Sequence, residues 1–188
     1  MGSFLKYLFQ IILSPAKGWE DVAYDLDEHI INVRHLYLHA FLPLIGICSV
    51  SAFVRLLYGA NDMLGCTASA IIGFVSMFLT YHLAIYSISS FMPRFVDKAA
   101  AKKQDQRKLA LVVMMSVGFI ALVILLANVI KVQLAIIQFL PFYVIFILWK
   151  GCGFLGVEPR QEGLYMILAS ASVLGAYYLL NFMFNALV

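Results

Sequence analysis

The stretch LALVVMMSVGFIALVILLANVI, residues 109–130, decides the fold class of this chain. It contains no charged side chain and is longer than the roughly 18 apolar residues that mark a membrane-spanning helix. At a rise of about 1.5 Å per residue, such a helix crosses a hydrocarbon layer about 30 Å thick. Lipid offers no hydrogen-bond partners to a bare backbone, so a segment of this kind spans the membrane as a helix.

The composition of the whole chain agrees with this prediction. Of the 188 residues, 63% are hydrophobic and 12% are charged, whereas soluble domains carry about 45–50% apolar and about 25% charged residues. The alternative, a soluble all-helical protein with a large core, leaves too little polar surface to face water. The length fits one membrane domain, which we divide into an N-terminal segment, residues 1–35, and a transmembrane part, residues 36–188.

Five apolar runs predict an all-α polytopic membrane protein with five transmembrane helices. The runs cover residues 36–58, 64–92, 109–130, 134–149 and 164–188. The fourth is about four residues short of a full crossing, and Pro141 in its middle removes a backbone hydrogen bond and predicts a kink. A re-entrant loop is the alternative for this run, but it places Lys150 and Arg160 outside, against the usual distribution of charge.

Lysine and arginine residues predict the orientation, because cytoplasmic loops carry an excess of them. With the N-terminus in the cytoplasm, only Arg55 and Lys131 of the 13 basic residues lie outside. Five crossings then place the C-terminus outside.

The segment before the first run begins with an amphipathic pattern. Phe4, Leu8, Ile11 and Ile12 fall on one face of a helix, which predicts an interfacial helix in the headgroup plane with this face toward lipid. Pro15 ends the helix, because the residue before a proline avoids the helical conformation. The apolar part is too short, and too interrupted by a polar residue, for a cleaved signal peptide.

Two oppositely charged segments follow on the predicted cytoplasmic side. The acidic one comes directly after a tryptophan suited to the membrane interface, and the basic one joins the second and third runs. Charges attract across about 8–10 Å at physiological ionic strength, so the acidic segment folds over the basic loop, or this loop holds anionic lipid. The alternative is two independently solvated segments. The candidate contacts for a partner or for lipid are Pro15, Trp19, Asp25, Lys102, Lys103 and Arg107.

A second candidate site consists of polar residues inside the apolar runs. His82 lies midway along the second run, and an ionisable residue at such a depth suggests a functional site; the alternative is a neutral histidine that hydrogen-bonds to a neighbouring helix. Asn128, Lys131 and Gln133 gather where the third run turns into the fourth. They line a vestibule for a solute, or they form an ordinary hairpin end with a snorkelling lysine.

Motifs for catalysis and metal binding are missing from the sequence. No nucleophile is paired with a base, and three widely spaced cysteines give no disulfide framework or zinc site. The letters GCGFLG, residues 151–156, match a dinucleotide-binding spacing, but they follow a membrane helix rather than a strand. We therefore expect no enzymatic activity, no cofactor, no metal and no nucleic-acid partner.

The pattern resembles the Yip family of Ypt/Rab-interacting integral membrane proteins. Ser14, Pro15 and Trp19 form a Ser-Pro-x-x-x-Trp signature, and YVIFILWKGCGFLGV, residues 143–157, runs from aromatic residues into a glycine-rich turn. The resemblance implies five packed crossings with the N-terminus inside. Eukaryotic members have long cytosolic N-terminal regions that matter for Rab GTPase binding. The short segment before the first run is more similar to prokaryotic members, which implies a bacterial inner membrane.

Two functions are compatible with these features. The first is a non-enzymatic membrane adaptor or membrane-organising protein that acts through its cytoplasmic face. Its partners are the lipid bilayer, anionic lipid in particular, and other membrane proteins or a second copy of the chain. The second is a small-solute or ion transporter or channel component, suggested by His82 and the polar hairpin end.

Overall fold

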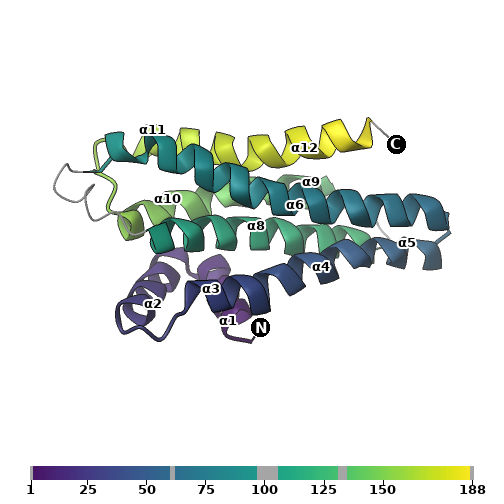
Figure 1. Cartoon of the computed structure of the whole chain (residues 1–188), viewed down its shortest axis with the longest axis horizontal. Coiled ribbons are helices and arrows are strands. Elements are labelled where there is room, and N and C mark those ends of the chain that lie inside the picture. The colour runs from purple at the N-terminus through teal and green to yellow at the C-terminus, as the bar shows by residue number, and fades with distance from the viewer. Residues whose placement is uncertain (1, 60–61, 97–105, 131–134, 187–188) are drawn as a thin grey trace.

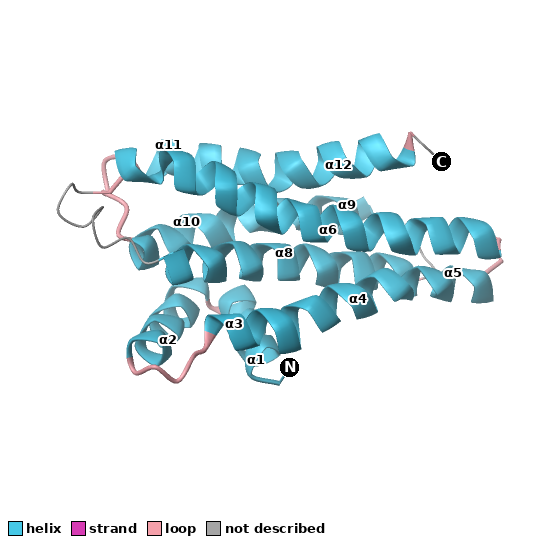
Figure 2. Cartoon of the chain, viewed as in Figure 1, coloured by secondary structure: helices cyan, strands magenta, loops and turns pink. Residues whose placement is uncertain are grey.

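The computed structural model describes residues 2–59, 62–96, 106–130 and 135–186, and over these residues the fold is all-α (Figures 1 and 2). The helices are α1 (Gly2–Leu13), α2 (Pro15–Asp27), α3 (Val33–Leu36), α4 (Leu42–Val50), α5 (Val54–Leu57), α6 (Met63–Phe91), α8 (Gln106–Val129), α9 (Ala135–Phe139), α10 (Tyr143–Leu155), α11 (Glu162–Ser170) and α12 (Ala176–Asn185).

Five helical segments are long and apolar enough to cross a membrane, as the five runs predict. They are Val33–Leu57, Met63–Arg94, Gln106–Val129, Ile136–Leu155 and Glu162–Asn185. We call the end of the bundle that carries α2 the N-terminal end. The opposite end, where α5 meets α6 and toward which α12 runs, is the distal end (Figure 1). The predicted fold class, with a short apolar helix at the N-terminus, is confirmed.

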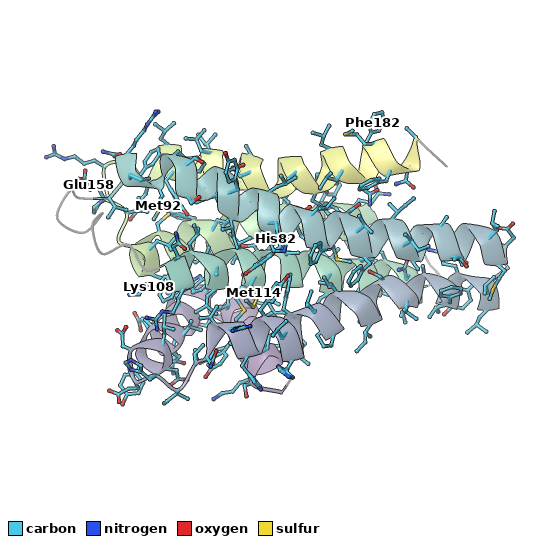
Figure 3. All side chains as sticks on the ribbon, in the orientation of Figure 1. His82, Met92, Lys108, Met114, Glu158 and Phe182 are labelled. Atoms are coloured by element: carbon cyan, nitrogen blue, oxygen red, sulfur yellow. The ribbon has the colours of Figure 1, made fainter. Side chains whose placement is uncertain are left out.

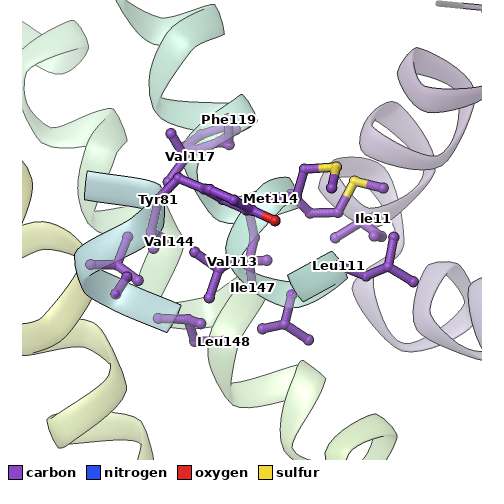
Figure 4. Packing of buried hydrophobic residues seen from close by; sticks show 14 of the residues in the cluster. Ile11, Tyr81, Leu111, Val113, Met114, Val117, Phe119, Val144, Ile147 and Leu148 are labelled. Carbon is purple, nitrogen blue, oxygen red and sulfur yellow. The ribbon is translucent and has the colours of Figure 1, made fainter. Parts of the chain in front are cut away.

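The third crossing, α8, is the central helix of the bundle. Of its apolar window 72% is buried, against 33–44% for the other four crossings. All side chains of residues 111–121 are buried, so no face of this stretch is left to lipid. Figure 4 shows Val113 and Met114 of α8 among Tyr81, Ile147 and Ile11, which come from three other helices. The rest of the bundle is built around this helix.

The first crossing contains a π-helical turn, Tyr37–Phe41, in which the amide of Leu42 donates to the carbonyl of Tyr37. Pro43 accounts for it, because proline has no N–H and its ring clashes with the carbonyl four residues earlier. A wider turn at this point keeps the helix continuous. It also presents Tyr37 to α6, where its ring centroid lies 5.0 Å from that of Tyr81.

The fourth run forms a helical segment, Ile136–Leu155, that is long and apolar enough to cross a membrane, which favours a crossing over the re-entrant alternative. Its segments α9 and α10 are joined by a 3₁₀ turn, Leu140–Phe142, at the predicted proline. α10 ends at the N-terminal end, where Val157 pairs with Val96 and the amide of Glu158 donates to the carbonyl of Phe95 at 3.1 Å.

The predicted end of this run at residue 149 was too early. α10 continues to Leu155, because Lys150 does not interrupt it. The ammonium group of Lys150 lies 4.4 Å from the ring centroid of Trp149 and 5.8 Å from that of Phe146. These cation–π contacts stabilise the charged side chain without ending the helix.

α1 and α2 form a helical hairpin around Ser14, with Pro15 as the first residue of α2. α1 is amphipathic, as predicted, but the face that we assigned to lipid is buried against protein. Phe4, Leu8 and Ile11 are fully buried, whereas Phe9 and Leu13 on the other side are exposed. The reason is that α1 covers α8: a Cβ on Gly118 of α8 would lie 3.2 Å from the ring of Phe4.

The hairpin closes at Gly18, where a Cβ would lie 2.8 Å from the backbone of Ile11. We expect Gly18→Ala to lower the free energy of unfolding by about 1–3 kcal/mol, since the backbone of α1 has to move away. In the matched variant Gly153→Ala, a Cβ meets nothing within 4 Å, and we expect a gain of up to about 1 kcal/mol from helix propensity. Unfolding in detergent measures both; equal effects contradict the close packing of the hairpin.

Candidate functional site

Trp19, which we expected at the membrane interface, is instead buried between α2 and α10. Only 3% of it is exposed. Its indole N–H donates to the carbonyl of Ile147 at 3.2 Å, and its ring stacks on Phe154 with centroids 5.1 Å apart. The indole also packs closely against Gly151 of α10, where a Cβ would lie 3.5 Å from the ring, an ordinary van der Waals distance. Trp19 therefore fastens α2 to the bundle and does not present itself to lipid or to a partner.

Asp25, another predicted contact, is half-buried and holds the hairpin together. Its carboxylate accepts a hydrogen bond from the hydroxyl of Tyr7 at 2.5 Å, and Gln10 donates in the same way to Asp21 one turn earlier. Burial and the Asp25 carboxylate raise the pKa of Tyr7 to about 12. Two acids that we expected to face the basic loop thus bind α1.

The C-terminus of α2 turns the chain toward the first crossing. His29 is in the left-handed conformation, with φ of 59°, and the amide of Ile30 donates to the carbonyl of Asp25. This is a Schellman motif, in which glycine is the usual residue. The strain of a non-glycine residue there costs about 1–2 kcal/mol. The turn brings the following residues, 31–34, next to the C-terminal half of α6 and the first turns of α8.

These residues line an open pocket of about 640 Å³ at the N-terminal end. We call it the N-terminal pocket. Its walls come from the segment before α3, from the first crossing, from α6 and from the first turn of α8. The lining residues are His29, Ile31, Asn32, Val33, Arg34, Tyr37, Tyr81, Ile85, Gln106, Arg107 and Ala110.

The chemistry of the N-terminal pocket is cationic at the rim and apolar at the wall. Arg34 and Arg107 contribute two permanent positive charges to the described lining of the pocket. Guanidinium groups bind phosphate and carboxylate oxygens in pairs. The aromatic rings of Tyr37 and Tyr81 and the side chain of Ile85 give a surface for an aliphatic chain. The pocket is therefore suited to an amphiphile with an anionic head.

His82 is an exposed residue of α6 next to Tyr81, which lines this pocket; it is labelled in Figure 3. Its Nε2 is 3.2 Å from the hydroxyl of Tyr37, and its ring centroid is 4.7 Å from that of Phe78. The structure thus gives the alternative that we considered for His82, a histidine hydrogen-bonded to a neighbouring helix. A role in a solute pathway stays a prediction.

The remaining predicted residues fall at the distal end or outside the described parts of the chain. Asn128 is buried, and its amide group donates to Ser51 of the first crossing at 2.8 Å. Lys102, Lys103, Lys131 and Gln133 lie outside the described residues. Pairing of the acidic segment with the basic loop therefore stays a prediction.

Sequence reasoning found Arg107 but missed Arg34, Tyr37 and Tyr81. Arg34 served only to predict the orientation, and the two tyrosines looked like ordinary aromatic residues of apolar runs. The proline shortly after Tyr37 was the available signal, since a proline inside a helical run marks a change of geometry. It gives no hint of the partner helix, which depends on the packing of the whole bundle.

The fold and the N-terminal pocket define a five-helix membrane protein with a cationic site at one end. No family model matches the chain, and comparisons with curated proteins and with solved structures also find no match. The resemblance to the Yip family therefore stays a prediction from the residues that carry it.

The raised pKa of Tyr7 predicts a dependence of stability on pH. Because folding raises this pKa above its ordinary value of about 10, the contribution of Tyr7 is complete below pH 10 and is lost as the pH rises to about 12. We expect the wild type to lose stability more steeply than Tyr7→Phe over this interval, measured by unfolding in detergent. Tyr24→Phe, at an exposed residue of α2, is the control; it should follow the wild type. Parallel curves for the wild type and Tyr7→Phe contradict the contact with Asp25.

Proposed function

We propose that the chain is a non-enzymatic membrane adaptor or membrane-organising protein of the Yip type that acts through its N-terminal end. This end faces the cytoplasm of a bacterium, and the protein lies in the inner membrane with its C-terminus outside. The N-terminal pocket holds the headgroup of an anionic lipid. The observation that carries the proposal is the pair of arginines, Arg34 and Arg107, above an aromatic and aliphatic wall.

The position of the pocket supports a lipid as the occupant. Arg34 begins the first crossing and Arg107 the third, so both charges stand where membrane helices leave the bilayer. Basic groups at such a position attract anionic lipids with about 1 kcal/mol each. The wall below them, formed by Tyr37, Tyr81 and Ile85, continues toward the hydrocarbon layer, where acyl chains lie.

The outer surface of α2 supports a protein partner next to the bound lipid. Trp19 and Val22 attach one face of α2 to the bundle and are buried. The other face is exposed and carries Glu20, Tyr24 and Asp27. An acidic helix that is held rigidly beside a lipid site suits recognition of a basic partner by charge complementarity.

Lipid binding tests the proposal directly. We expect the double variant Arg34→Gln/Arg107→Gln to bind phosphatidylglycerol about thirtyfold more weakly, since two contributions of about 1 kcal/mol are lost. The control Lys17→Gln removes a charge from the same end, at an exposed residue of α2 outside the pocket, and should change the affinity less than twofold. Native mass spectrometry of the detergent-solubilised protein measures both. Equal affinities for the double variant and the control contradict the lipid site.

The orientation has its own test. We expect a reporter that is active only outside the cytoplasm to be active when fused after the last described helix, α12, and inactive when fused before α1. The reason is the distribution of the 13 basic residues, of which only Arg55 and Lys131 then lie outside. Activity of the N-terminal fusion and inactivity of the C-terminal one would reverse the proposed orientation.

A further inference from the structure

We propose a second binding site at the distal end of the bundle, for a small group that carries a negative charge and a hydrogen-bond donor. The site is a pocket of about 240 Å³ where four of the five crossings meet, and we call it the distal pocket. It shares no residue with the N-terminal pocket, and it goes beyond the proposed function. The residues that determine its chemistry are Ser49, Arg55, Asn128, Asn181 and Asn185.

Arg55 supplies the charge of the distal pocket. It lies two residues before the end of the first crossing, at the end of the bundle opposite to most of the described basic residues. Among the described residues its guanidinium group has neither a carboxylate nor a hydrogen-bond partner. A guanidinium group with five N–H donors and no carboxylate partner in the described part of the chain, close to a membrane, is suited to an anion from outside the chain.

Hydrogen bonds inside the bundle fix what Asn128 offers to a ligand. The hydroxyl of Ser51 donates to the carbonyl of Cys48, so its oxygen is left to accept, and it accepts from the amide group of Asn128. The side-chain carbonyl of Asn128 consequently has no donor within the described part of the chain, although the residue is only 4% exposed. A buried acceptor without a donor is destabilising, and a donor group on a ligand or a ligand-bound water removes this penalty.

Ser49 and the asparagines of α12 add to the same pattern. Ser49 donates its hydroxyl proton to the carbonyl of Ile45 at 2.7 Å, which leaves its oxygen as an acceptor. Asn185 donates to both oxygens of Asn181, backbone and side chain, at 2.7 Å each, which leaves the carbonyl of the Asn185 side chain as an acceptor. The distal pocket thus combines one cation with several acceptors. A simple anion pairs only with the cation, whereas an anion that also carries a hydroxyl or ammonium group can donate hydrogen bonds to the acceptors as well.

The size of the distal pocket limits the occupant. A volume of about 240 Å³ equals roughly eight water molecules at about 30 Å³ each, and it is below the range of about 300–1,000 Å³ that is typical of drug-sized ligands. The pocket accommodates a headgroup or a small solute, but not a lipid chain. The shared chemistry is a phosphate or carboxylate next to a hydroxyl or ammonium group.

Three probes separate the sources of this chemistry. Phosphatidylglycerol carries a phosphodiester and two hydroxyls in a lipid, phosphatidylmethanol carries the phosphodiester without the hydroxyls, and glycerol 3-phosphate carries the group as a free solute. Native mass spectrometry counts the bound lipids, and isothermal titration in detergent measures the free solute. Binding of phosphatidylglycerol alone identifies a headgroup site, and binding of glycerol 3-phosphate identifies a site for a solute; either result supports the proposal.

Variants locate the binding in the distal pocket. We expect Arg55→Gln to weaken the binding of the preferred probe at least about tenfold, from the loss of hydrogen bonds to a charged group. Arg160→Gln removes the same charge from an exposed position at the N-terminal end and should change it less than twofold. Both variants keep Arg34 and Arg107, so binding in the N-terminal pocket cancels in the comparison. Asn128→Leu should abolish the preference for phosphatidylglycerol over phosphatidylmethanol and leave anion binding in place.

The outcome that overturns the proposal is equal binding by the Arg55→Gln and Arg160→Gln variants, or no binding of any probe by the wild type. If Arg55→Gln does not give a monodisperse protein, Arg55→Lys replaces it, since lysine keeps the charge but lacks the planar fork. Arg55→Lys should then bind several-fold more weakly than the wild type, and wild-type affinity would equally overturn the proposal. Failure of this site leaves the function proposed for the N-terminal end untouched, because the two pockets have different residues.

Discussion

The enclosure of α8 is the constraint on which the rest of the structure depends. Lipid is as apolar as leucine, so helices in a membrane associate through close packing and not through the hydrophobic effect. A helix whose residues 111–121 are all buried has to be covered on every side. α4, α6 and α10 cover most of it, and α1 covers the part around Gly118 with the ring of Phe4. The N-terminal helix is therefore part of the core.

The position of the N-terminal pocket follows from this enclosure through a chain of contacts. α1 packs against α8. α2 is held to α1 by the close packing of Gly18 on the backbone of Ile11 and by the hydrogen bond from Tyr7 to Asp25. Trp19 joins α2 to α10, and the left-handed turn at His29 then leads the chain over the ends of α6 and α8. Together these contacts lead the chain to the pocket that Arg34 and Arg107 both line.

The sequence was sufficient for those parts of the fold that depend on polarity and on proline. The five crossings, the amphipathic α1 and the turn at Pro141 follow from apolar length, periodicity and the missing amide of proline. The sequence was not sufficient to predict which helices pack against one another. The crossings are apolar on all sides, so their composition does not tell which one is enclosed and which face meets lipid. Tyr37 and Tyr81 meet because of helix packing, and packing depends on shape.

The two pockets bear on the choice between binding and transport. Along α8 the N-terminal pocket ends at Ala110 and the distal pocket begins at Ile124. Between them lies the fully buried stretch of residues 111–121, whose one polar side chain, Ser116, donates to the carbonyl of Val112 in its own helix. A solute that moves from one pocket to the other along α8 has to separate close-packed helices, which disrupts the core. The two proposed binding sites, one at each end of an enclosed helix, require no such change, which supports the proposed adaptor function.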